Sequence, residues 1–184
     1  MKPGDHPEFF RLPPPPGRSR ESSIVLTREG RFVHDGEPVQ HPGMHRAFAS
    51  WLTRHPDDGR YILSNGYDWS YLTVEGAAYF VASVSPGAGA PRLQLLDGRE
   101  LAVQPAMLST DAQGRVWARL PDGEKACFTA AAQLGLEPWL SERDGRLGLE
   151  LSGQFFPIVA DAADAADAAD AVDDAAGTPT VPRS

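Results

Sequence analysis

The sequence predicts an α+β fold of two similar small halves, each a short antiparallel sheet with one helix. Short apolar strands alternate with glycine-containing turns through the middle of the chain, and two segments carry apolar residues at helical spacing. The order strand, turn, strand, helix, turn, strand occurs twice, with 29 residues from Gly30 to Gly59 and 31 from Gly114 to Gly145. This agreement predicts an internal duplication, although frequent hairpins in any α+β chain would produce a similar spacing by chance.

Composition divides the 184 residues into four segments. Residues 1–20 form a proline-rich arm, with four consecutive prolines from Pro13, for which we expect a disordered, extended conformation. Residues 21–104 form the first half with an extra hairpin, and residues 105–158 form the second half. Residues 159–184 form an acidic tail rich in Asp and Ala that we expect to be disordered.

The charge distribution excludes some classes of partner. The net charge of the chain is -8. The tail has six aspartates and one arginine, a charge of -5, and the arm has four cations and two acids, a charge of +2. A charge of -5 therefore remains for residues 21–158. A mildly acidic body repels nucleic acid, so we expect no nucleic-acid partner. No apolar run approaches the length of a membrane span, so we expect no membrane partner. A single cysteine, Cys127, favours the reducing cytoplasm.

The strands are predicted chiefly from Gly-Arg dipeptides, which occur six times in the chain. Five of them introduce a predicted strand, because glycine readily takes the positive φ that tight hairpin turns require. These five strands cover residues 31–34, 60–63, 99–103, 115–120 and 146–151. Apolar residues predict further strands at 24–26 and 106–108, and the run 85–91 is interpreted as a long hairpin tip.

The first predicted helix begins at Pro42 and ends before Asp57, Asp58 and Gly59. Its apolar stripe consists of Met44, Phe48, Trp51 and Leu52. The second predicted helix opens around Pro121 and ends at Gly135. Its thin apolar face consists of Cys127, Ala130, Ala131 and Leu134.

Four short motifs, in this order, resemble a known family. They are EGRF at 29–32, DGEPV at 35–39, DGRYIL at 58–63 and SGQFFPI at 152–158. Residues 24–158 thereby resemble DUF1285, a bacterial domain of unknown function. The resemblance implies two similar α+β halves in one unit and a role in ligand sensing or signalling, and it transfers no catalytic residue. The chain has VEGAAY at 74–79 where the family pattern suggests VEDAPF, so a site built on that acidic pair is not expected.

Catalytic and metal-binding motifs do not stand out. His41 and His45 are spaced for one helix face, but the glutamate of HExxH is missing and Cys127 offers the only thiol. We interpret these histidines as capping or surface residues and predict no metal and no cofactor. The sequence has no GxSxG, P-loop or GxGxxG motif, so no catalytic residue is assigned and an enzyme is disfavoured.

The residues proposed to bind a ligand are aromatic. In a strand, Tyr67, Trp69 and Tyr71 share one face, and Arg46 on the first helix could pair with an anion. We predict that these four residues bind a small anionic or aromatic ligand in the seam between the halves. Burial of the aromatics between sheet and helix is the competing interpretation. The predicted function is a non-enzymatic ligand-binding or signalling module; the alternatives are an enzyme with acid and base on separate turns, and a protein interaction module. The oligomeric state is not predicted.

Overall fold

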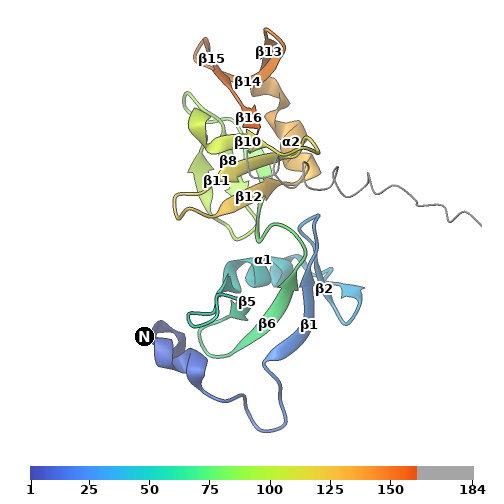
Figure 1. Cartoon of the computed structure of the whole chain (residues 1–184), viewed down its shortest axis with the longest axis vertical. Helices are drawn as coiled ribbons and strands as arrows, with labels where there is room; N and C mark the ends of the chain where they lie inside the picture. The colour runs from blue at the N-terminus through green and yellow to red at the C-terminus, as the bar shows by residue number, and fades with distance from the viewer. Residues whose placement is uncertain (161–184) are drawn as a thin grey trace, which may run out of the picture.

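The structure is a computed structural model that describes residues 1–160, and it consists of two lobes (Figure 1). The N-terminal lobe comprises residues 1–74 and the C-terminal lobe residues 79–160. Both combine sheet with one α-helix, so the predicted α+β class is confirmed. No helix among these residues is both long and apolar enough to cross a bilayer.

A six-stranded sheet forms the N-terminal lobe. Its two central strands, β1 and β6, are parallel, and every other neighbouring pair is antiparallel. The strands in spatial order are β3 (Glu37–Pro38), β2 (Phe32–His34), β1 (Glu21–Leu26), β6 (Trp69–Val74), β5 (Tyr61–Ser64) and β4 (Leu52–Arg54).

Helix α1 (Pro42–Trp51) covers one face of this sheet, as the sequence predicts. The His41 ring is a cap, because its Nδ1 accepts a hydrogen bond from the Met44 amide at 3.3 Å. Phe48 and Trp51 pack on the core of the lobe, whereas Met44, which we predicted to lie in the same stripe, is 45% exposed. The helix ends at Trp51, earlier than predicted, and Leu52, which we predicted to lie in its apolar stripe, begins the extended strand β4.

Two further sheets form the C-terminal lobe. The larger has seven strands, in the order β16 (Val159–Ala160), β10 (Leu108–Thr110), β11 (Val116–Arg119), β12 (Lys125–Phe128), β7 (Tyr79–Ser85), β8 (Arg92–Leu95) and β9 (Glu100–Ala102). The smaller has three antiparallel strands, β13 (Leu140–Arg143), β14 (Arg146–Leu151) and β15 (Gln154–Pro157). Short 3-10 turns η3 (Pro105–Met107) and η4 (Glu137–Trp139) complete the lobe.

The second helix is shorter than predicted. Helix α2 is Ala130–Leu136, capped by Thr129, whose side chain accepts from the Ala132 amide. The residues before it form β12, because Gly123 has a φ of 89° and closes a tight turn between β11 and β12. The apolar side chain of Cys127 therefore lies in a strand and not on the helix.

All five predicted Gly-Arg hairpins are confirmed. Each of these dipeptides lies between two antiparallel strands, in the pairs β1–β2, β4–β5, β8–β9, β10–β11 and β13–β14. At the last of them Asp144 and Gly145 both have positive φ, 52° and 71°, which is the geometry of a type I′ turn. The run 85–91, interpreted as a hairpin tip, connects the antiparallel strands β7 and β8, although Ser85 itself still belongs to β7 and pairs with Arg92.

The predicted division into two similar halves differs from the structure. Strands β7, β8 and β9, assigned to the first half, lie in the second sheet, because β7 pairs with β12. The lobes therefore divide between Val74 and Tyr79 and not at residue 104. The strand orders of the two large sheets differ, and an internal duplication is not shown.

The N-terminal arm also differs from the expectation of an extended, disordered segment. It contains two 3-10 helices, η1 (Pro3–Asp5) and η2 (Pro7–Arg11). Phe9 is buried against Ile62 and Trp69, so the arm has an apolar anchor that its proline content obscures. Of the predicted acidic tail, residues 159 and 160 form β16, and the rest lies outside the described residues.

The two lobes share part of one core. Phe80 of β7 and Cys127 of β12 belong to the same buried cluster as Leu26, Phe32 and Leu72 of the N-terminal lobe. This contact positions the hairpin between β1 and β2 against the C-terminal lobe, and the cavities at the seam form around it.

Candidate functional site

The predicted aromatic residues lie on or beside β6. Trp69 and Tyr71 share one face of the strand, with ring centroids 5.2 Å apart, and Trp69 is only 6% exposed. Tyr67 precedes the strand, is 66% exposed, and has the Lys2 ammonium 5.6 Å from its ring centroid. Two of the three aromatics therefore share a face, and the third lies at the surface.

The shared face is covered by the arm. The Phe10 and Trp69 ring centroids are 6.1 Å apart, and His55 lies 4.9 Å from Trp69 and 5.6 Å from Tyr71. His55 is itself buried, with its Nε2 3.3 Å from the Phe10 carbonyl. The chain's own side chains thus occupy the aromatic surface, as the packing interpretation expects.

Arg46 lies on the other side of the sheet. Leu72 of β6 packs in the cluster that contains Ala49 of α1, whereas Trp69 packs with Phe9 in a different cluster. Arg46 lines a cavity of about 580 Å³ together with His45 of α1 and residues 94–96 and 98 of the C-terminal lobe. The structure therefore does not bring Arg46 together with the three aromatics, but it does place Arg46 at the seam.

A second seam cavity has about 1000 Å³ and is lined by residues of both lobes. The β1–β2 hairpin contributes Arg28, Glu29 and Arg31, and the C-terminal lobe contributes Arg115 of the β10–β11 hairpin. The other lining residues are uncharged: Phe80, Gln113, Cys127, Phe128, Thr129, Ala130, Ala131 and Gln133. Three arginines and one glutamate give this cavity a positive charge in a chain of net charge -8.

The guanidinium groups of this cavity are largely free to bind a ligand. Within residues 1–160, neither Arg28 nor Arg31 makes a side-chain hydrogen bond or an ion pair. The pKa of Glu29 is lowered, chiefly by a hydrogen bond from Thr27 and less strongly by the charges of Arg31 and Arg28. Glu29 therefore stays ionised but leaves the two guanidinium groups available.

Arg115 is held in place by a buried carboxylate. Its Nε donates to Asp111 Oδ2 at 2.6 Å, and Trp117 Nε1 donates to the same oxygen at 2.9 Å. Burial alone would raise the pKa of Asp111, but the hydrogen bonds from Trp117 and Arg115 outweigh it, and the pKa is lowered. The two terminal nitrogens of Arg115 make no hydrogen bond within residues 1–160, so they can reach an anion in the cavity.

The thiol of Cys127, which lines the cavity, is expected to be unreactive. Burial raises the pKa of its thiol to about 11, so the thiol is protonated near neutrality and is a poor nucleophile. Within residues 1–160, no group of three or more His, Cys, Asp or Glu is placed to hold a metal ion. The described lining of the cavity combines three arginines with one carboxylate, that of Glu29.

The sequence contained a signal for this cavity that we did not use. Arg31 and Arg115 each follow the glycine of a Gly-Arg turn, and these are the first such turn of each predicted half. We interpreted the dipeptides only as turns. Their arginines meet because the two hairpins lie at the same seam, which only the long-range packing determines.

Comparison with known proteins supports the resemblance that the motifs suggested. A crystal structure of a DUF1285 family protein from Silicibacter pomeroyi DSS-3 superposes with a TM-score of 0.55, covering 75% of this chain and 80% of that chain at 23% identity. The fold of this chain resembles that of the DUF1285 family. A DUF1285 family protein from Shewanella baltica OS155 gives a TM-score of 0.49 at 15% identity, covering 65% of this chain and 94% of that one. No family model matches the chain, and no curated protein matches it.

Proposed function

We propose that the protein is a non-enzymatic module that binds a small multivalent anion in the cavity between its lobes. The observation that supports this proposal is that the guanidinium groups of Arg28 and Arg31 have no hydrogen-bond or ion-pair partner among residues 1–160 and line the same cavity as Arg115. Guanidinium groups bind phosphate and carboxylate oxygens in a bidentate manner, and three of them match an anion with two or more charges. A volume of about 1000 Å³ admits a molecule larger than a bare phosphate.

The position of the cavity supports a regulatory role. Arg28 and Arg31 belong to the N-terminal lobe, and Arg115 belongs to the C-terminal lobe. An anion that contacts all three binds the closed arrangement of the lobes better than an open one, and so shifts the population toward it. Signalling through such a shift is the role that we propose for the module. We also propose a cytoplasmic location, because the single cysteine is buried and forms no disulfide.

The sequence-predicted ligand residues divide under this proposal. Arg46 stays in it, as a cation on the neighbouring seam cavity. Trp69 and Tyr71 pack under the arm, and we assign them to the core of the N-terminal lobe. The enzyme alternative is less well supported, because Glu29 is the one carboxylate that lines the arginine cavity among the described residues, and its lowered pKa makes it a poor proton donor near neutrality.

Titration calorimetry with inorganic tripolyphosphate tests the proposal. We expect saturable binding to the wild type, and at least about tenfold weaker binding to the double variant Arg28→Gln, Arg31→Gln, since each charge-assisted contact contributes substantially. Arg146→Gln is the matched control, because Arg146 also follows a glycine but lies on the distant sheet of β14. An equal loss in the control would indicate non-specific attraction, and an unchanged double variant would reject the site.

Native mass spectrometry of freshly purified protein provides an independent test. We expect the wild type to carry a copurified anion that the double variant lacks. A copurified molecule retained equally by both proteins would place the ligand elsewhere.

A further inference from the structure

A third cavity lies within the N-terminal lobe, away from the seam. It has about 310 Å³ and is bounded by the arm on one side and by the open part of the sheet and α1 on the other. The residues that line it are Pro15, Arg18, Ser19, Arg20, Ser22, Ile24, His34, Phe48, Trp51, Leu63, Asn65, Asp68, Trp69 and Ser70. The cavity thus exists because the arm folds back along the sheet.

Two arginines of the arm border this cavity, and only one of them is engaged. Arg20 Nη1 donates to Asp68 Oδ1 at 2.6 Å and to the Trp69 carbonyl at 2.8 Å, and its guanidinium stacks on the Trp69 ring at 4.4 Å. This pairing neutralises Asp68. The Arg20 side chain is therefore a structural part of the wall.

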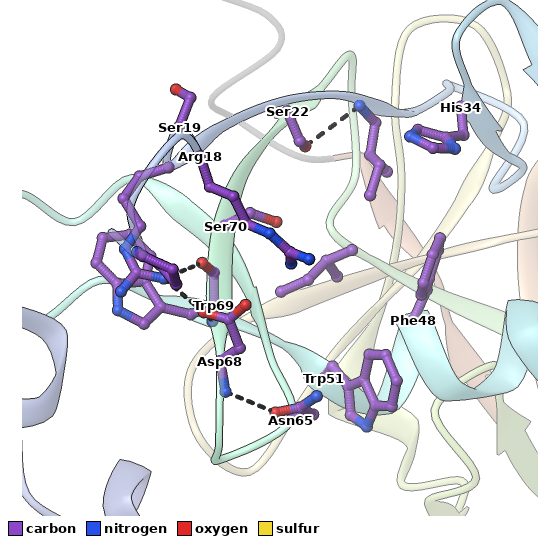
Figure 2. Close-up of a pocket in the computed structure, with 14 residues that line it drawn as sticks. Arg18, Ser19, Ser22, His34, Phe48, Trp51, Asn65, Asp68, Trp69 and Ser70 are labelled. Carbon is purple, nitrogen blue, oxygen red and sulfur yellow. Dashed lines mark hydrogen bonds and ion pairs between the residues drawn. The ribbon is translucent and has the colours of Figure 1, made fainter. Parts of the chain in front are cut away.

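Arg18 has no such partner. Its guanidinium makes no hydrogen bond or ion pair within residues 1–160. Figure 2 shows the Arg18 side chain extending into the pocket, toward the side on which Phe48 and Trp51 lie. Burial alone would raise the pKa of Asp68, the one carboxyl among the described lining residues, but Arg20 and Arg18 both lower it. The two arginines therefore leave the pocket a net positive charge.

The remaining walls divide into a polar and an apolar part. Ser19 and Ser70 lie on the side of the arm and β6, whereas the rings of Phe48 and Trp51 lie on the opposite side (Figure 2). Asn65 Oδ1 already accepts the amides of Tyr67 and Asp68 at 2.8 Å each, which leaves the amide nitrogen of Asn65 as a donor. Figure 2 shows Asn65 beside Trp51, so a free amide donor lies next to the aromatic rings, and the arm and β6 supply the polar side.

We propose that this pocket is a second binding site, for a small monocarboxylate with an aromatic or apolar body. The carboxylate pairs with Arg18, and the body packs on Phe48 and Trp51. Arg18, Arg20 and Asp68 together leave one net positive charge in the pocket, which matches a single negative charge on the ligand. The small volume limits the body to about one ring.

Phenylacetate is the probe, and its binding is followed by NMR titration of the full chain. We expect saturable shifts, with a dissociation constant at least about tenfold larger for Arg18→Gln than for the wild type, because the charge-assisted pair is lost. Phenylacetamide has the same ring without the charge. We expect it to bind weakly, and with the same affinity, to the wild type and to Arg18→Gln. Because Arg18 is exposed and makes no side-chain hydrogen bond or ion pair within residues 1–160, its variant should unfold close to the wild-type midpoint.

Two further variants separate this site from the seam. Trp51→Ala is expected to weaken phenylacetate binding, whereas Arg28→Gln should leave it unchanged while weakening tripolyphosphate. No saturable binding of phenylacetate up to about 10 mM, equal affinities for the acid and the amide, or an unaffected Arg18→Gln variant would each overturn the proposal, whatever the result at the seam.

Discussion

Gly30 lies in close contact with Phe80 of the C-terminal lobe. It has a φ of 78°, and a Cβ added to it would lie 2.9 Å from Cγ of Phe80. A side chain there therefore meets both backbone strain and a buried ring. This position explains why the hairpin between β1 and β2, which carries Arg28 and Arg31, can lie against the C-terminal lobe.

Gly30→Ala is expected to destabilise the protein by about 2 to 4 kcal/mol, from left-handed strain and overpacking together. Urea unfolding measures the difference. Gly114→Ala is the matched control, since Gly114 has a φ of 76° but would have nothing within 4 Å of its added Cβ. The control should lose only the strain contribution of about 1 to 2 kcal/mol. Equal losses would show that contact with Phe80 is unimportant.

Asp111 is the buried charge on which Arg115 depends, and its side chain is fully buried. Its carboxylate accepts from the amides of Gln113 and Arg115 as well as from two side chains. Asp111 lies three residues before the turn glycine, Gly114, and so stands outside the Asp-Gly pairs from which turns were predicted. Thr27 lies at the same position before Gly30. The side chain of Thr27 accepts from the Arg31 amide, as that of Asp111 accepts from the Arg115 amide. The repeated pattern could have been found from the sequence; the burial could not.

Asp111→Asn is expected to cost about 2 to 4 kcal/mol at neutral pH, because a charge-assisted network is broken inside the fold. The pKa of Asp111 is lowered from its ordinary value of 3.8, so its stabilisation is present above that value and is lost as the pH falls through the lower pKa of the folded protein. Stability measured from neutral pH downward should therefore fall less steeply in the variant. Parallel acid profiles would contradict this assignment.

At the scale of elements, the N-terminal arm packs on the first sheet through a buried phenylalanine and an arginine–aspartate pair. Phe9 contacts the cluster of Ile62 and Trp69, and Arg11 donates to both carboxylate oxygens of Asp57, at 3.0 and 2.9 Å. The two phenylalanines were visible in the sequence, but the prolines around them favoured an extended, unpacked segment. The surface that receives them exists only once β5 and β6 have paired.

Phe9→Ala and Trp69→Ala are each expected to destabilise the protein, the tryptophan variant by about 3 to 5 kcal/mol, as large aromatic truncations in cores do. The double variant should lose less than the sum, with a coupling of about 0.5 to 3 kcal/mol, since the two rings share one cluster. Hydrogen exchange should accelerate in residues 1–12 of the Phe9 variant. Leu12→Ala, at a residue 57% exposed, is the control and should change little. Additive losses would place the arm outside the core.

The second helix shows the limit of periodicity in short segments. Cys127, Ala130 and Leu134 fit a helical face, yet the first of them is in β12. Asp122 and Gly123 form a turn of the same kind as the Gly-Arg turns, and a strand after that turn was the consistent prediction. Local turn chemistry was thus more informative than the spacing of small apolar residues.

At the scale of the whole molecule, the sequence predicted the hairpins, the first helix and the α+β class, because these depend on neighbouring residues. It did not predict which strands join which sheet. The parallel pairing of β7 with β12 joins Phe80 to Cys127, 47 residues apart, and no local pattern records it. The candidate cavity depends on that pairing. The turns that carry its arginines could be predicted from the sequence, but the proximity of those turns in the fold could not.

The central place of β7 in the second sheet also has a consequence for the order in which the protein forms during synthesis. The N-terminal lobe is complete once β6 has left the ribosome, and β8 follows β7 at once. The other edge of β7 has no partner until residues 125–128 are made. For that interval a largely apolar strand exposes unpaired amides and carbonyls to other chains. The nascent chain is thus most prone to aggregate after β7 is made and before β12 is made, when its first lobe is already folded.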